Sequence, residues 1–210
     1  MKAFIFDFDG VIVDSERYWR ELDETFFPGI APGYTMDHAA QMMGLGRKAG
    51  YEFLVQTLGM TMTFETYVTV LDEEVAKIYG DKTALLPGLP ELLVRLQKSG
   101  YNIGLASSSQ QKWVEQGLVR LGIREAFQAI STADDVNHKT KPAPDLYLHA
   151  AAALGVSPED CTALEDSKNG ITSAKAAGMT CFAIRTDMNP EQDLSQADEV
   201  YESLHNIQLV

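Results

Sequence analysis

Two aspartates that directly follow a short apolar run at the N-terminus constrain this 210-residue chain more than any other feature. The run is AFIF, residues 3–6, and its strand-forming side chains predict a buried β-strand. Asp7 and Asp9 come next, and Gly10 permits a sharp turn beside them. Acids two residues apart project from the same side of an extended chain. Both carboxylates are therefore expected in one crevice at the end of the strand.

The chemistry of such a pair follows from its charge. Two buried like charges this close are unfavourable unless a cation lies between them or one carboxyl is protonated. Mg²⁺ suits the site, because it takes hard oxygen ligands and keeps water and substrate phosphate beside few carboxylates. The pattern D-x-D-x-G also begins an EF-hand calcium loop, but that loop follows a helix and spaces its acids further along the chain.

Composition excludes several classes of protein. The formal net charge of −13 opposes binding to nucleic acid or to an anionic membrane. No stretch approaches the roughly twenty apolar residues that span a bilayer. The first residues indicate a strand and not a signal peptide, so we expect a cytoplasmic protein. Cys161 and Cys181 each lie at the start of an apolar segment, and we predict free thiols in the core.

Strands and helices alternate along the chain after residue 88. This alternation predicts an α/β fold, a doubly wound parallel sheet with helices on both faces. The expected strands are 102–107, about 127–131, 161–165 and 180–185, and the expected helices are 89–99, 109–121, 144–154 and 167–177.

A long segment after the acid pair is surplus to this sheet. Helix 89–99 already supplies the crossover between the first two strands, so residues 15–83 are not needed for it. We predict a core domain of residues 1–14 and 84–210 and an inserted helical cap of residues 15–83. The cap helices are expected at 14–27, 36–43, 47–58 and 64–79, with the first ended by Pro28. Such a domain could act as a lid over a catalytic crevice, or it could be a purely structural bundle.

Three further strand ends carry suitable side chains. Serines 107–109 offer hydroxyls and backbone N–H groups near a helix start, Lys141 precedes a Pro-Ala-Pro segment, and Glu165 with Asp166 ends a strand. Alone, the serines could be a helix cap and the lysine a solvated side chain. Ligands bind at the carboxyl ends of strands in such sheets, so together these groups predict phosphoryl transfer onto a carboxylate.

Four motifs in chain order resemble the haloacid dehalogenase superfamily. The chain is similar to the subgroup of phosphatases and beta-phosphoglucomutases that carry a helical cap after the first motif. The motifs are DFDGVIVDSE (7–16), LASSS (105–109), KPAPDLYL (141–148) and LEDSKNGITSAKAAGM (164–179).

The resemblance implies roles for four acids. Asp7 is the implied nucleophile, which forms an aspartyl-phosphate, and Asp9 protonates the leaving oxygen and later activates water. Mg²⁺ is implied to bind the Asp7 side chain, the backbone carbonyl of Asp9 and Asp166. Glu165 would be a ligand through water or a group that orients the other ligands.

Phosphate and substrate contacts complete the implied site. Ser107 and Lys141 would hold the transferring phosphoryl oxygens, helped by the backbone N–H of Ser108. In the cap, Gly44 could let its loop approach the active site, and Arg47 could bind an anionic or polyhydroxyl substrate bidentately. An exposed arginine at a helix start is the alternative reading of Arg47.

We therefore predict a Mg²⁺-dependent phosphatase for a small phosphorylated metabolite, with a sugar phosphate as the expected class and a monomer as the default. A phosphosugar mutase is less favoured, because similar mutases carry a histidine where this chain has Trp19. Asp9 argues against a dehalogenase, and arginine at position 47 cannot form the Schiff base of phosphonate-cleaving relatives. A non-enzymatic phospho-receiver is the alternative outside enzymes, but receivers carry their aspartate on a middle strand and lack a cap.

Overall fold

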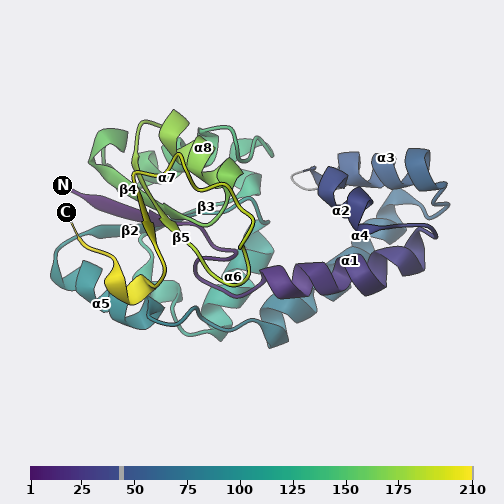
Figure 1. Cartoon of the computed structure of the whole chain (residues 1–210), viewed down its shortest axis with the longest axis horizontal. Coiled ribbons are helices and arrows are strands. Elements are labelled where there is room, and N and C mark those ends of the chain that lie inside the picture. The colour runs from purple at the N-terminus through teal and green to yellow at the C-terminus, as the bar shows by residue number, and fades with distance from the viewer. Residues whose placement is uncertain (43–44, 210) are drawn as a thin grey trace. The chain divides into compact units, whose positions relative to one another are not determined.

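The computed structural model describes residues 1–42 and 45–209 and divides into two compact units (Figure 1). The larger one, here called the core unit, comprises Met1–Asp14 and Thr83–Val210. The smaller one, here called the helical unit, comprises Ser15–Lys82. Within the described part of the chain, no helix is long and apolar enough to cross a bilayer.

A six-stranded parallel sheet forms the centre of the core unit. Its strands are β1 (Ala3–Phe6), β2 (Asn102–Ala106), β3 (Ala129–Ser131), β4 (Cys161–Glu165), β5 (Thr180–Ile184) and β6 (Glu199–Tyr201). They lie in the order β3-β2-β1-β4-β5-β6, so β1 pairs with β2 on one side and β4 on the other. The predicted α/β fold is confirmed. The direction of winding changes beside β1, and sheets of this kind bind ligands at that point.

Four helices cover the two faces of the sheet. They are α5 (Leu89–Lys98), α6 (Gln111–Arg120), α7 (Asp145–Leu154) and α8 (Lys168–Ala176). Figure 1 shows α7 and α8 on one side and α5 and α6 on the other. Ala3 and Ile5 pack in a buried cluster with side chains of α7 and α8. Phe4 and Phe6 alternate with them and face the opposite layer, where the ring of Phe6 contacts Phe127.

The helical unit contains α1 (Glu16–Ile30), α2 (Met36–Met42), α3 (Arg47–Leu58) and α4 (Phe64–Lys77), followed by a π-helical turn, Ile78–Lys82. The prediction that Pro28 ends the first helix is wrong, because α1 continues through it to Ile30. Pro28 lies in the last turn, where it removes one backbone donor, and the Ala31 N–H still bonds to the Phe27 carbonyl.

Further differences from the prediction concern a short edge strand and the start of one helix. Strand β6 was not expected, because its three residues form an edge strand without an apolar run. Helix α6 begins at Gln111 and not at 109. Single 3₁₀ turns complete the core unit at Arg124–Ala126, Ala133–Val136, Pro158–Asp160 and Leu204–Asn206.

The segments at which the chain leaves and re-enters the core unit pair with each other. The N–H of Asp14 donates to the carbonyl of Ala84, and the N–H of Ala84 donates to the Asp14 carboxylate over 2.6 Å. Val13 and Leu85 form an antiparallel bridge beside them. Both segments are thereby fixed to the core unit side by side.

Candidate active site

Three neighbouring strands deliver predicted site residues to one edge of the sheet. Asp7 directly follows β1, Ser107 follows β2, and Glu165 is the last residue of β4. Backbone hydrogen bonds extend beyond the strands, since Asp7 N–H donates to Leu164 O and Ser107 N–H donates to Ser131 O, each over 2.9 Å. The sheet itself therefore fixes the backbone positions of these side chains.

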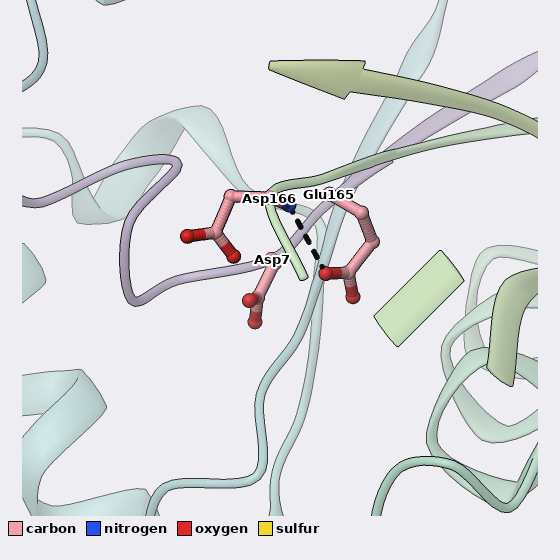
Figure 2. Close-up of side chains that lie close together, drawn as sticks. All are labelled: Asp7, Glu165 and Asp166. Atoms are coloured by element: carbon pink, nitrogen blue, oxygen red, sulfur yellow. Dashed lines mark hydrogen bonds between the residues drawn. The ribbon is translucent and has the colours of Figure 1, made fainter. Parts of the chain in front are cut away.

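Asp7, Glu165 and Asp166 form a compact acidic cluster (Figure 2). One carboxylate oxygen of each lies within 4.8 Å of the others, and all three residues are buried. The dashed line in Figure 2 is the hydrogen bond from the Asp166 N–H to Oε2 of Glu165, 3.3 Å long. The fourth predicted acid, Asp9, has its carboxylate outside this cluster and accepts a hydrogen bond from Ser109 Oγ over 2.8 Å.

Lys141 supplies a positive charge to the cluster. Its Nζ lies 2.6 Å from Oδ1 of Asp7 and 2.6 Å from Oε1 of Glu165, and its side chain is only 7% exposed. The cluster thus holds three carboxylates, and one ammonium group pairs with two of them. The excess negative charge and the all-oxygen donor set fit a hard divalent cation such as Mg²⁺. Asp7 and Asp166 would be the side chains that hold it.

Burial raises the pKa of Asp7 to about 8, and the neighbouring Glu165 and Asp9 add to this effect while Lys141 opposes it. Burial alone would lower the pKa of Lys141, but Asp7 and Glu165 outweigh it and raise that pKa above its usual value. Lys141 is therefore charged at neutral pH. A further cation bound beside Asp7 would favour its ionised form.

Two glycines make room for the acids. Gly10 has a φ of +79°, and a Cβ at this position would collide with the Asp166 carboxylate. A Cβ at Gly170, in α8, would collide with the carboxylate of Glu165. The start of α8 is capped by Ser167, whose Oγ accepts from the Gly170 N–H over 3.1 Å. The two acids can thus approach the backbone this closely only because Gly10 and Gly170 have no side chain.

The serines after β2 lie in a loop that precedes α6. Ser107 is fully buried, and its Oγ accepts from the Ser109 N–H over 3.0 Å. Ser108 is exposed. The sequence predicted that the helix begins at Ser109, but α6 begins at Gln111, so Ser109 lies in the loop before the helix. The loop nevertheless joins Ser107, beside the acid cluster, to the Ser109 hydroxyl that holds Asp9.

Two residues that contact the site were missed in the sequence. The Tyr147 hydroxyl donates to Oε1 of Glu165 over 2.6 Å, and Nδ2 of Asn189 donates to the backbone carbonyl of Asp166 over 2.7 Å. Tyr147 lies in the third motif between Leu146 and Leu148, where a hydroxyl between two apolar residues was a usable signal. Asn189 lies in a loop, and neither its residue type nor its spacing from the motifs indicated a role in the site.

The predicted cap residues are located within the helical unit as far as the chain is described. Arg47 begins α3, and its guanidinium makes two contacts with the carboxylate of Asp72 in α4. Gly44 lies outside the described residues. Nε1 of Trp19 donates to the hydroxyl of Tyr79 over 3.2 Å.

Comparison with known proteins decides the family. The sequence profile of the haloacid dehalogenase-like hydrolases matches residues 4–184. The chain belongs to this family. It is 37% identical to YhcW of Bacillus subtilis, provisionally named a phosphatase, over 100% of this chain and 94% of the relative. It is 35% identical to the beta-phosphoglucomutase of the same organism, over 88% of this chain and 82% of that one.

The solved structures agree with this assignment. The crystal structure of CbbY from Rhodobacter sphaeroides in complex with phosphate is similar over 98% of this chain and 96% of its own, with a TM-score of 0.83 and 26% identity. The resemblance seen in the four motifs is thus confirmed at the level of family and fold.

Proposed function

We propose that this hydrolase is a Mg²⁺-dependent phosphatase that cleaves a small phosphorylated metabolite, with a sugar phosphate as the expected class. The observation that carries the proposal is the Lys141 ammonium held between Asp7 and Glu165, beside Asp166. The names of the relatives support it, since one is provisionally a phosphatase and another acts as a phosphoglucomutase.

The proposed chemistry uses two aspartates in turn. An oxygen of Asp7 attacks phosphorus, and the ester bond breaks as Asp9 gives its proton to the leaving oxygen. Asp9 then takes a proton from water, which attacks the phosphoryl group, releases inorganic phosphate and regenerates Asp7. The hydrogen bond from Ser109 fixes the Asp9 carboxyl for both proton transfers.

Charge is compensated by the other side chains. Ser107, the Ser108 N–H and Lys141 bind the oxygens of the transferring phosphoryl group. Asp7, Asp166 and the Asp9 backbone carbonyl are the proposed Mg²⁺ ligands, with Glu165 acting through water or as an orienting group. When bound, the ion neutralises phosphoryl charge and favours ionised Asp7.

We assign substrate selection to the helical unit, Ser15–Lys82, as a cap, with Gly44 and Arg47 as its proposed substrate contacts. We also propose a cytoplasmic location, supported by Cys161 and Cys181, which are free thiols buried in the core unit as predicted. A monomer stays the working assumption.

Phosphate release from a panel of phosphorylated sugars tests this function. Asp7→Asn removes the nucleophile but keeps the side-chain shape, so release should fall at least about a thousandfold while the fold is retained. The exposed Asp160→Asn is the matched control and should keep parental activity. EDTA should abolish release and Mg²⁺ should restore it. Turnover by Asp7→Asn, or undiminished turnover in EDTA, would overturn the proposal.

A mutase is the second candidate, favoured by the 35% identity to beta-phosphoglucomutase. Trp19 occupies the position of the mutase histidine, and its indole is engaged with Tyr79 inside the helical unit. Priming with a sugar bisphosphate separates the two activities. A mutase would form isomer faster than it releases phosphate, and we expect the reverse.

A further inference from the structure

The hydroxyl of Tyr147 reaches the acid cluster from the first turn of α7. The residue is fully buried, and its hydroxyl donates to Oε1 of Glu165 over 2.6 Å. Nζ of Lys141 lies at the same distance from this oxygen and 5.3 Å from the centre of the Tyr147 ring. One carboxylate oxygen thus has two close donors.

The hydrogen bond from Tyr147 to Glu165 affects how Lys141 is shared between Glu165 and Asp7. The ammonium is equally close to Asp7, with 2.6 Å between Nζ and Oδ1. The contacts at the other oxygen of Glu165 are long, 3.3 Å from the Asp166 N–H and 3.4 Å from Ser167 Oγ. Without the tyrosine, Lys141 would be the one close donor to Glu165 among these contacts, and the buried carboxylate would draw it away from Asp7.

Packing alone does not account for the hydroxyl. The ring belongs to the buried apolar cluster between the sheet and helices α7 and α8. Phenylalanine would fill the same space, whereas a buried hydroxyl costs free energy unless it is bonded. The bond to Glu165 satisfies it, so the oxygen atom of Tyr147 contributes to the arrangement of charges and not to the volume of the core.

We propose that Tyr147 is a positioning residue of the active site. Its hydroxyl fixes the carboxylate of Glu165 and so keeps the Lys141 ammonium shared with Asp7, where it is placed for the transferring phosphoryl group. Tyr147 touches none of the reacting atoms. The inference deepens the proposed phosphatase function and rests on it for the role of Lys141.

Tyr147→Phe tests the inference, because it removes one oxygen atom and keeps the ring. We expect kcat to fall about tenfold with KM within about twofold, and Mg²⁺ to bind the metal-free protein about tenfold more weakly by calorimetry. Tyr201→Phe is the matched control. It breaks a tyrosine–glutamate hydrogen bond to Glu199 in the edge strand β6 and should leave both quantities unchanged.

A double-mutant cycle with Glu165→Gln tests whether Tyr147 acts through Glu165. If it does, the loss in the double variant is smaller than the product of the two single losses. Independent losses, or a Tyr147→Phe variant within twofold of the parent in both kcat and Mg²⁺ affinity, would overturn the inference. If the parent releases no phosphate from any ester, the phosphatase function fails, while the Mg²⁺ calorimetry still tests Tyr147.

NMR on the parent protein tests the same inference without any substitution. The hydroxyl proton of Tyr147, buried in a short bond to a carboxylate, should give a downfield NMR resonance protected from exchange with water. This resonance should shift when Mg²⁺ enters the acid cluster. A Tyr147 hydroxyl that exchanges freely, or a resonance that Mg²⁺ leaves in place, would contradict the inference.

Discussion

Lys141 and Arg47 both form ion pairs, but their surroundings differ. In the core unit, the Lys141 side chain is 7% exposed and is shared by two carboxylates at the ends of strands. In the helical unit, Arg47 and Asp72 join α3 to α4, with side chains 20% and 23% exposed. Removing one partner of a buried ion pair destabilises the protein more than removing one partner of an exposed pair, because the remaining charge stays buried without solvent. We therefore expect a substitution in the core site to affect both activity and stability strongly, and a substitution of Arg47 to affect stability only weakly.

The largest effect is expected from removing the buried ammonium. Lys141→Met leaves Asp7 and Glu165 without their cation and should lower the free energy of unfolding by about 3 kcal/mol in metal-free buffer at pH 8. Lys139→Met is the control, since Lys139 pairs with Asp145 from a side chain that is 66% exposed, and it should cost no more than about 0.5 kcal/mol. Urea unfolding measures both. Equal losses of unfolding free energy in the two variants would contradict the expectation that the buried pair contributes more to stability.

The titration of Asp7 gives the next prediction. Its pKa is raised to about 8 in the folded chain, against 3.8 for the ordinary carboxyl. The contribution of this pKa shift to folding stability is fully present below pH 3.8 and is lost as pH rises through 8. Between these two pH values the folded state keeps the Asp7 proton and the unfolded state does not. Mg²⁺ must displace this proton, so its affinity should increase from pH 6 to pH 9.

Calorimetry in buffers of different ionisation enthalpy measures the proton that Mg²⁺ displaces. We expect about one proton released per ion bound at pH 6.5, and much less at pH 9.5. Asp7→Asn should bind the ion without this release. A parent protein that binds Mg²⁺ with the same affinity and no proton release across this range would contradict the assignment.

Much of the core site could be predicted from sequence because strands fix it. An apolar run followed by acids places carboxylates at the end of a parallel strand, and Asp7, Glu165 and Asp166 indeed meet there. Lys141 was found through its motif. The partners of these groups could not be predicted, since Ser109 contacts Asp9 across about 100 positions and Asn189 reaches Asp166 from a loop.

The fold shows the same division. Alternating strands and helices were predicted because their apolar residues have a clear period, whereas β6 has three residues and no such pattern. Pro28 was expected to end α1, but a proline in the last turn costs only one backbone hydrogen bond. The partner of Arg47 depends on how α3 packs against α4, which spacing along the chain does not specify.

Asn189 extends the comparison to a neutral side chain at the core site. It donates to the backbone carbonyls of Asp166 and Ile184 and accepts from the Thr186 N–H. Asn189→Ala should lower the free energy of unfolding by about 2 kcal/mol, since buried groups lose their partners, and weaken Mg²⁺ binding severalfold. The exposed Asn206→Ala should change neither. Thermal unfolding and calorimetry check both values, and unchanged Mg²⁺ binding would exclude a role for Asn189 in placing Asp166.

The smallest effect on stability is expected at Arg47. Arg47→Met breaks the pair with Asp72 and should lower the free energy of unfolding by about 1 kcal/mol or less. If Arg47 contacts substrate, KM should increase while kcat changes little. An unchanged KM would leave Arg47 as a structural residue of the helical unit.

A crystal structure with Mg²⁺ and beryllium trifluoride tests the phosphoryl-transfer site most directly. We expect the trifluoride to be bonded to a carboxylate oxygen of Asp7, with Ser107 and Lys141 on its fluorines and the ion ligated by Asp7 and Asp166. An adduct on another residue, or an ion held away from these two acids, would contradict it.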